Sequence, residues 1–331
     1  MKSLISCKQV FKTSVVQAHL TNSNRWWSNY IFHFSHITNV ASILNNSMLL
    51  SREELEKFSN SNLNDNASQE VINGTDDKYK DYVRFYFRPL TPTQHHNEGI
   101  RAKEEITELG AHCPVPIFLL FNTIMLDDKK FFFSYESLAS HYDVPLYQGM
   151  EALKDAPFNH IYHNQSTVNL DGSTIRKRRH AEVVTKKQCD LKYLQKIVCR
   201  NSAEAETLLD LLTPNAKALY HDKICVIGVD EFDTKDYFSL FKPPRLQIVK
   251  VSIDNHRSSI NFNKPSQSKY NLEVNWLDLN GNVICHYINK DFTLPTHTQS
   301  FNMLKFLEKK QQVRIIIKLD SCLVYSNLFT L

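Results

Sequence analysis

The chain has 331 residues, of which 42% are hydrophobic and 22% are charged, and its formal net charge is +4 at pH 7. This composition argues against a disordered chain. The net charge of the whole molecule is too small to indicate that it binds nucleic acid. The length predicts two domains, or one large domain with an appendage.

The spacing of the cysteines and the absence of several sequence motifs exclude further classes of protein. The seven cysteines are scattered without a C-x-x-C pair, which argues against a zinc site or a disulfide framework and favours a reducing compartment. No run approaches the roughly 18 apolar residues of a membrane span. Lys8 and Lys12 interrupt the N-terminal stretch, which argues against a secretion signal. Together with the cysteine pattern and the short apolar runs, this leads us to expect a cytoplasmic protein with no membrane partner and no metal. The absence of G-x-G-x-x-G and G-x-x-x-x-G-K excludes a Rossmann or P-loop nucleotide site.

The first predicted elements are a strand and a helix. Residues 30–36 alternate between two faces, which predicts a strand, and Thr38 or Asn39 is the expected cap of the following helix. Residues 58–81 are polar and Asn-rich, which indicates a long surface loop. A second strand is predicted within 82–94, with its apolar face formed by Val83, Phe85 and Phe87.

The middle of the chain combines apolar strands with a strongly basic segment. Strands are predicted at 115–125 and 130–138, followed by a stretch, 140–174, with many aromatic and histidine residues. Residues 175–200 carry nine Lys or Arg side chains against two carboxylates, a local charge that attracts phosphates. Four of these cations and a histidine come just before Glu182 and the strand AEVVT, and are expected to form a loop: Arg176, Lys177, Arg178, Arg179 and His180.

The last third of the sequence changes character. A helix capped by Asn201 is predicted at 201–212, and from about residue 245 the pattern becomes that of alternating strands. Asn280-Gly281 predicts a two-residue hairpin turn. We therefore expect a first domain at 1–240 and, after a Pro-Pro hinge at 243–244, an all-β, sandwich-like domain at 245–331.

Three separated segments, HFSHITNVASIL, VRFYFRPLTPTQHHNEGI and RKRRHAEVV, together resemble the DarT family over roughly residues 28–200. The resemblance implies an α+β ADP-ribosyltransferase fold of two small packed sheets with helices. It also implies NAD-dependent transfer of ADP-ribose to a base in single-stranded DNA. The family's usual setting is a bacterial toxin–antitoxin or phage-defence operon, whose antitoxin, DarG, carries a macrodomain that removes the modification.

One departure from the family leaves the target base open. Thymine-modifying members tend to have a Ser-Pro-Met-like run after the arginine strand, whereas this chain has LTPTQHHNEG. This run looks like a different branch, some members of which modify guanine. The resemblance is therefore compatible with guanine or thymine as the target.

Glu182 is the expected catalytic carboxylate. Transfer of ADP-ribose breaks the bond between nicotinamide and ribose, and positive charge develops on the sugar. A nearby carboxylate stabilises that charge and accepts the proton of the attacking base nitrogen. One carboxylate is enough because nicotinamide is a good leaving group. The pattern alone favours a structural reading, in which Glu182 is an acid that guards the edge of a strand, and it is the resemblance that implies catalysis.

The resemblance also implies the residues that bind NAD. Arg88 would hold a phosphate through its planar fork and belongs to the expected catalytic pair, although a cation at a strand end is often structural. His36 would contact the ribose and nicotinamide, although a lone histidine in such a place is often a packing residue. The remaining expected NAD-binding residues are Ser35, Thr38, Asn39 and Tyr86.

The basic run would follow the DNA backbone, with aromatic residues of 142–163 stacking on a splayed base. Tyr162 and His163 are the specific expectations. Single-stranded DNA is favoured because the target nitrogen must be free of a duplex. RNA as substrate, or a non-enzymatic nucleic-acid-binding protein that uses the basic patch 176–200, stays open. The C-terminal domain carries no catalytic constellation, and either an antitoxin, a phage or regulatory trigger, or nucleic acid is its expected partner.

Overall fold

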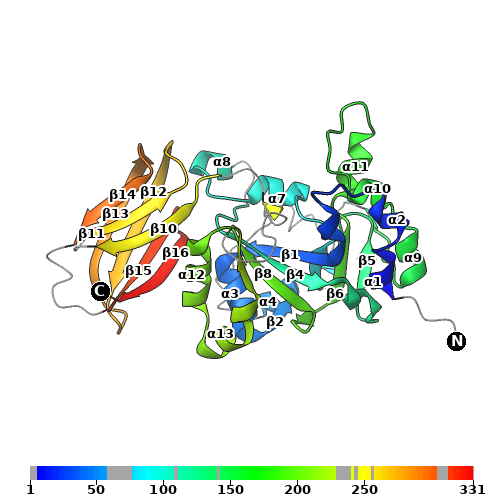
Figure 1. The fold of residues 1–331 in the computed structure, drawn as a ribbon, viewed down its shortest axis with the longest axis horizontal. Coiled ribbons are helices and arrows are strands. Elements are labelled where there is room, and N and C mark those ends of the chain that lie inside the picture. Colours follow the sequence, from blue (N-terminus) through cyan, green and yellow to red (C-terminus); the bar gives the residue numbers. More distant parts are fainter. Residues whose placement is uncertain are drawn as a thin grey trace.

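In the computed structural model, the described residues are 6–57, 77–107, 111–139, 142–228, 240–241, 245–254, 257–303 and 312–330. The polar stretch 58–76 and the Pro243–Pro244 pair, predicted as a loop and a hinge, lie outside these ranges. The same holds for most of the predicted boundary between the domains. Strands β10 to β16 gather at one end of the molecule and the remaining elements at the other (Figure 1).

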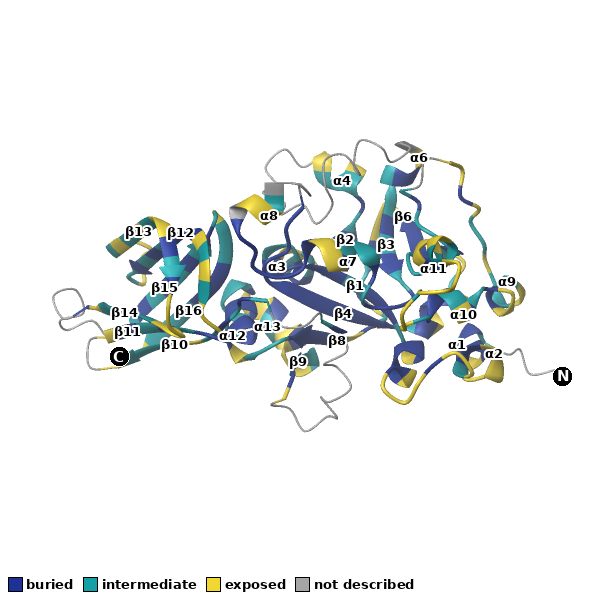
Figure 2. Cartoon of the chain, turned by 90° about the horizontal axis from the view of Figure 1, so that it is seen from above, coloured by how far each residue is buried: buried dark blue, intermediate teal, exposed yellow. Residues whose placement is uncertain are grey.

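A seven-stranded sheet forms the centre of the N-terminal part. Its strand order is β5-β6-β3-β1-β4-β8-β9, and all its pairs are antiparallel except β8 with β9. Strands β1 and β4 are almost wholly buried (Figure 2). The strands are β1 Tyr30–His36, β3 Tyr82–Tyr86, β4 Pro116–Asn122, β5 Phe132–Ser134, β6 Glu182–Lys186, β8 Leu194–Cys199 and β9 Ile224–Val226.

This sheet and its helices match the expected α+β class, but one seven-stranded sheet stands in place of the expected pair of small packed sheets. The pairing of Phe32 with Tyr86 joins β1 to β3, so the strands form one continuous sheet. A separate two-stranded ribbon is formed by β2 Met48–Leu50 and β7 Gln188–Asp190. The alternation in β3 is as predicted, because Val83, Phe85 and Phe87 are buried on one face while the residues between them are half-buried.

Helices and short 3-10 turns flank the sheet. The helices are α1 Cys7–Val10, α2 Ser14–Gln17, α3 Ile37–Asn46, α4 Arg52–Glu56, α6 Asp77–Lys80, α7 Pro92–Asn97, α8 Lys103–Thr107, α9 Met150–Lys154, α10 Phe158–Ile161, α11 Gly172–Arg178, α12 Ser202–Leu211 and α13 Pro214–Tyr220. The 3-10 turns are η1 Arg25–Asn29, η2 Thr123–Asp127 and η3 His221–Lys223. The helix predicted at 201–212 is confirmed, including its cap, because the Asn201 side chain accepts from the Glu204 amide.

Two local predictions were wrong. The cap of α3 is His36, whose backbone is extended and whose Nδ1 faces the Thr38 amide, so Thr38 and Asn39 lie inside the helix. The basic run expected as a loop lies in and just after helix α11. Asp171 caps that helix through the Thr174 amide, and the buried Ile175 anchors it, which a search for long apolar periodicity overlooks.

The C-terminal part is a sandwich of two antiparallel sheets, as predicted. One sheet has the order β10-β11-β14 and the other β13-β12-β15-β16. The rings of Trp276 and Phe301, one from each sheet, pack edge to face with 5.1 Å between their centroids. The β12–β13 hairpin has a longer loop than the predicted two-residue turn, spanning 278–282. The strands are β10 Ile248–Asp254, β11 Arg257–Phe262, β12 Ser266–Leu277, β13 Val283–Leu294, β14 Thr298–Asn302, β15 Gln312–Leu319 and β16 Cys322–Thr330.

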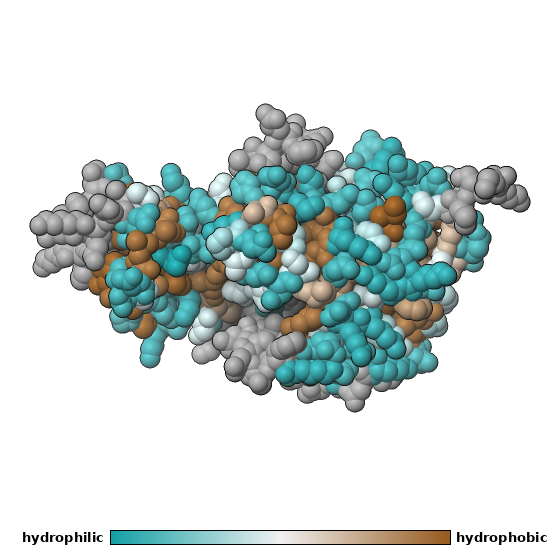
Figure 3. All heavy atoms as spheres, turned by 90° about the horizontal axis from the view of Figure 1, so that it is seen from below, coloured by the Kyte–Doolittle hydropathy of each residue, from teal (hydrophilic) through white to brown (hydrophobic). Residues whose placement is uncertain are grey.

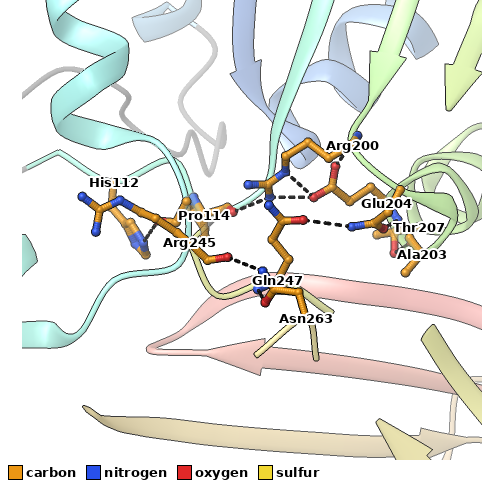
Figure 4. A network of polar contacts seen from close by, with 11 residues as sticks. His112, Pro114, Arg200, Ala203, Glu204, Thr207, Arg245, Gln247 and Asn263 are labelled. Atoms are coloured by element: carbon orange, nitrogen blue, oxygen red, sulfur yellow. Dashed lines mark hydrogen bonds and ion pairs between the residues drawn. The ribbon is translucent and has the colours of Figure 1, made fainter. Parts of the chain in front are cut away.

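Helix α12 connects the sandwich to the central sheet. Tyr325 of β16 donates to Glu206 at 2.7 Å, and the Ser326 hydroxyl donates to Asp210 at 2.5 Å. The neighbouring polar network reaches both parts of the chain (Figure 4). Within it Arg200 donates to Glu204 at 2.7 Å, while Asn201 donates to Gln247 at 3.4 Å. The two parts therefore share polar contacts as well as apolar surface.

No helix in the described ranges is long and apolar enough to cross a membrane. Among the same residues, no group of three or more His, Cys, Asp or Glu side chains is arranged to hold a metal ion.

Candidate active site

Glu182 lies in a row of side chains that crosses three strands of the central sheet. It is directly opposite Tyr86 of β3 and Ser134 of β5. Residues that face each other in antiparallel strands project from the same side of the sheet, and so do residues two apart along one strand. Arg84, two residues before Tyr86, therefore shares the face of Glu182.

The Glu182 carboxylate has one cation and two neutral donors around it. The Ser137 hydroxyl donates to Oε1 at 3.2 Å, and the Leu138 amide donates to Oε2 at 3.3 Å. Nη1 of Arg84 lies 3.9 Å from Oε1. Burial raises the pKa of Glu182, while Arg84 and the two donors act in the opposite direction, with a net pKa above the usual range.

Glu182 is 1% exposed, so its carboxylate is enclosed by the surrounding residues. Ser137 and Leu138, just after β5, cover the carboxylate through the two hydrogen bonds they donate. The carboxylate is thus correctly placed on a strand, but in this structure it is closed off.

Arg88 does not offer its guanidinium to a phosphate. It is 2% exposed and lies over the Trp27 ring, with 4.8 Å between the guanidinium carbon and the ring centroid. Four of the five N–H groups of an arginine are used within the chain. Their acceptors are the carbonyl oxygens of Pro89, Ile161 and His163 and the Asn164 side chain, at 2.9, 3.1, 2.5 and 2.8 Å. Burial lowers its pKa to about 9.

The strand directions also separate Arg88 from His36. Tyr86 pairs with Phe32, so Arg88 continues beyond Tyr86 towards the start of β1, whereas His36 ends that strand. With about 3.3 Å per residue, His36 lies roughly 13 Å along the strand from Phe32. The structure therefore does not gather the two expected NAD-binding residues in one place.

The expected NAD-binding residues at the end of β1 do lie together. Nδ1 of His36 is 2.8 Å from the Thr38 hydroxyl, and the Asn39 side chain donates to Ser35 at 3.0 Å. His36 is 1% exposed, and burial, followed by the nearby charges of His112 and Arg200, lowers its pKa to about 3. The Leu323 backbone acts in the opposite direction on this pKa, which places strand β16 close to His36, while the buried Nε2 of His36 has no hydrogen-bond partner among the described residues.

The expected nucleic-acid residues divide into an exposed group and a group bound within the chain. Arg176 and Lys177 are exposed, and Lys177 lies over the Tyr142 ring at 5.5 Å. Arg178 pairs with Glu136 at 3.4 Å. Arg179 donates to the His163 carbonyl at 2.9 Å and contacts the His163 ring at 2.8 Å.

Tyr162 and His180 do not match the expectation of a surface that binds bases. Tyr162 is fully buried and stacks on Phe158 with 5.6 Å between the ring centroids, so no base reaches it in this structure. Burial lowers the pKa of His180 to about 4, so its ring is neutral at pH 7. Tyr142, which is 47% exposed beneath Lys177, is the aromatic ring that a base can reach.

Sequence reasoning missed two side chains next to Glu182. The position of Arg84 could be predicted from the period of two along β3, because Arg84 and Tyr86 project from the same face of the strand. Ser137 carried no such signal, since its contact with Glu182 joins residues 45 positions apart.

Comparisons with known proteins place the chain. No curated protein matches its sequence. Among solved structures, the chain is similar to Thermus sp. 2.9 DarT in complex with ADP-ribosylated ssDNA, at 17% identity, TM-score 0.46, covering 60% of this chain and 93% of that one. The same DarT in complex with NAD⁺ has 18% identity, TM-score 0.43 and coverages of 60% and 94%. Thermosipho africanus DarTG in complex with ADP-ribose has 16% identity, TM-score 0.44 and coverages of 66% and 53%.

A family model described as ssDNA thymidine ADP-ribosyltransferase, DarT, matches residues 32–227. This match includes the strands that carry His36, Arg84 and Glu182, and it ends before the C-terminal sandwich. Because the match spans more than half of the chain, the protein belongs to the DarT family and is an NAD-dependent ADP-ribosyltransferase, as the sequence resemblance predicted.

Proposed function

We propose that the protein transfers ADP-ribose from NAD to a thymine base in single-stranded DNA and releases nicotinamide. The observation that carries this proposal is the DarT match over residues 32–227, within which Glu182 lies beside a cation on the central sheet. In the reaction, the bond between ribose C1′ and nicotinamide breaks, and nicotinamide leaves with the bonding electrons. The base nitrogen forms the new bond to C1′ and loses its proton.

Glu182 supplies the chemistry of this step. Its carboxylate stabilises the positive charge that develops on the ribose, and it accepts the proton from the base. Ser137 and Leu138 must release it first, since their two hydrogen bonds cover it in this structure. Closure around the bound NAD would then exclude water, which competes with the base for the ribose carbon.

The His36 cluster is the proposed contact for the NAD ribose and nicotinamide. His36, Ser35, Thr38 and Asn39 bring two hydroxyls, an amide and a neutral imidazole to one strand-to-helix turn. Neutral hydrogen-bonding groups suit the hydroxyls of a ribose and the carboxamide of nicotinamide. Leu323 lies against this turn, so access for NAD also involves strand β16.

Arg176, Lys177 and Tyr142 form the proposed DNA contact. The two cations are exposed on α11, and the Tyr142 ring lies beneath Lys177. Cations that follow phosphates and an aromatic ring that stacks on a base are the usual combination for single strands. Stacking on Tyr142 would hold the base out of a neighbouring stack.

Labelled NAD tests the proposal directly. The protein is incubated with oligonucleotides that each contain a single thymine or a single guanine, and the product is identified by mass spectrometry. We expect one ADP-ribose on the thymine of single strands and none on duplexes. Transfer to guanine instead would support the branch suggested by the LTPTQHHNEG run. Transfer to RNA of equal sequence, or to protein alone, would overturn the DNA assignment.

The Glu182→Gln variant separates an enzyme from a protein that only binds nucleic acid. We expect this variant to lose transfer and to keep its affinity for single strands, since Glu182 is buried whereas Arg176 and Lys177 of α11 are exposed. If the effect of the protein on cells were unchanged by Glu182→Gln, non-enzymatic binding would be the better account.

The biological setting is proposed from the family. We infer a cytoplasmic toxin that is counteracted by a DarG-like macrodomain antitoxin, as in toxin–antitoxin or phage-defence operons. Expression in bacteria should be toxic, and the toxicity should disappear with Glu182→Gln or with a co-expressed macrodomain hydrolase. Persistent toxicity in both cases would contradict this role.

The C-terminal sandwich, proposed as a separate domain at 245–331, is the proposed site for a partner or trigger. Hydrophobic atoms gather on part of its surface (Figure 3). Three exposed apolar side chains belong to the β12–β13 hairpin and its loop, namely Leu279, Val283 and Ile288, at 65%, 60% and 49% exposure. Pull-down with and without these side chains changed to serine tests whether an antitoxin or a phage protein binds there.

A further inference from the structure

Arg84 lies beside Glu182, and the proposed reaction assigns it no role. Its side chain projects from the middle of β3 on the face of Glu182, with Nη1 3.9 Å from Oε1 of the carboxylate. The Arg84 side chain is 24% exposed, whereas the Glu182 side chain is 2% exposed. One partner is therefore partly in water while the other is enclosed.

The backbone and side chain of Arg84 are both held in place. Its carbonyl oxygen is 3.0 Å from Nδ1 of His33 on the neighbouring strand, and its Nη2 donates to the Tyr79 carbonyl at 3.4 Å. These contacts restrain Arg84 while its Nη1 lies 3.9 Å from Oε1 of Glu182. The arginine is thus fixed before any substrate binds.

The groups that face Glu182 leave Arg84 as its counter-charge in the described part of the chain. Tyr86, on β3, is neutral because burial raises the pKa of its phenol. Ser137 and the Leu138 amide are neutral donors from the covering segment. When Ser137 and Leu138 move aside, Glu182 loses both hydrogen bonds, and Arg84 is what continues to favour the charged carboxylate.

Arg88 does not take this role. Four of its N–H groups are used by chain oxygens, and it is absent from the charges that act on the Glu182 pKa. The two arginines of β3 and its continuation therefore have different tasks.

We propose that Arg84 is a positioning residue for the transfer reaction, which holds Glu182 as an oriented carboxylate when the covering segment opens. This inference rests on the proposed function. A protonated Glu182 neither stabilises a cationic sugar nor accepts a proton, so the reaction requires its ionised form. Arg84 makes that form available at neutral pH despite the burial of the carboxylate.

Kinetics of two variants at Arg84 test the inference. We expect Arg84→Met to lower kcat at pH 7 by at least about tenfold, with a much smaller change in KM for NAD, and to recover activity as the pH rises. The sign follows from the loss of the cation: the pKa of Glu182 rises further, so ionisation needs a higher pH. Arg84→Lys keeps the charge and should restore most of kcat and the original pH profile.

Direct titration of Glu182 gives a readout that does not depend on transfer. The carboxyl ¹³C signal of Glu182 is identified by its absence in Glu182→Gln and followed with pH. We expect Arg84→Met to raise the measured pKa of Glu182 by about 1 to 3 and Arg84→Lys to change it little. Arg52→Met is the matched control, because Arg52 pairs with Glu56 at 3.7 Å and is similarly exposed, at 28%.

The outcomes are distinguishable. An unchanged Glu182 pKa in Arg84→Met, or a kcat loss that is equal at every pH and is not rescued by lysine, overturns the role of Arg84. If Arg84→Met fails to fold, Arg84→Lys decides alone: a shifted pKa with the charge retained contradicts the inference. Absence of transfer in the unaltered protein would overturn the proposed function, while the titration still measures the Arg84–Glu182 coupling.

Discussion

Arg88 and Arg179 donate to the same acceptor, the carbonyl oxygen of His163, at 2.5 and 2.9 Å. Two guanidinium groups on one neutral oxygen indicate that the segment 161–165 is tied down from both sides. Arg88 is the buried member and Arg179 the half-buried one. The main task of Arg88 in this structure is therefore to fix the chain that precedes α11.

Replacing Arg88 by methionine should destabilise the protein. The change removes the donor that the buried Ile161 carbonyl receives from Arg88 and leaves the His163 carbonyl with Arg179 as donor, and we expect a loss of about 2–4 kcal/mol in the free energy of unfolding. Urea denaturation measures it. A variant of unchanged stability with a raised KM for NAD would instead support the phosphate-binding role that the sequence suggested.

Glu182→Gln should become relatively more stable as the pH rises. Burial raises the folded-state pKa of Glu182 above its ordinary value of 4.5, so ionisation costs stability in the folded protein. Below the ordinary value the carboxyl is neutral in both states and the two proteins should differ little. As the pH rises above 4.5, the unaltered protein should lose stability relative to Glu182→Gln. Melting temperatures measured at about pH 4 and about pH 7.5 check the sign, and a smaller advantage at the higher pH would contradict it.

Replacing Arg176 and Lys177 by glutamine should weaken binding to single-stranded DNA to a similar extent for all sequences. Both side chains are exposed, so the fold should be unaffected. We expect the slope of log affinity against log salt to fall by about 0.7 for each phosphate that the variant no longer neutralises. Lys269→Gln with Lys290→Gln, two exposed cations of the sandwich, is the matched control. An equal effect of the control pair would show that only net charge matters.

Asp210→Ala should loosen the packing of α12 against β16. Asp210 accepts from Ser326 at 2.5 Å and pairs with Arg314 at 3.1 Å, and its side chain is 8% exposed. Removing these interactions should cost about 1–3 kcal/mol. Urea denaturation followed by circular dichroism measures this loss. A midpoint equal to that of the unaltered protein would mean that Asp210 does not hold the two parts together.

The strands and the longest helices were predictable because their signals are local. Strand β3 was predictable from the alternation of Val83, Phe85 and Phe87 with other residues, and the start of α12 was predictable from Asn201, a residue type that often caps helices. The single seven-stranded sheet was not predictable in the same way. Its continuity depends on the pairing of Phe32 with Tyr86, and such a long-range pairing leaves no periodic trace in the sequence.

The candidate site was predicted in its members more than in its arrangement. Glu182 and the His36 cluster stay predictions from the resemblance, and the two donors to the Glu182 carboxylate come from Ser137 and Leu138, which are distant from it in the sequence. Tyr162 was expected on the surface because the sequence of a basic region does not show whether its aromatic residues are buried or exposed. In the structure Tyr162 is buried and stacks on Phe158.

Strand β16 contacts both α12 and the turn that holds His36. Heat should therefore melt the sandwich and the sheet in one cooperative event, with equal calorimetric and van't Hoff enthalpies. The C-terminal sandwich would then stabilise the part of the chain that carries Glu182. Removing the sandwich would expose the surface of that part which β16 covers.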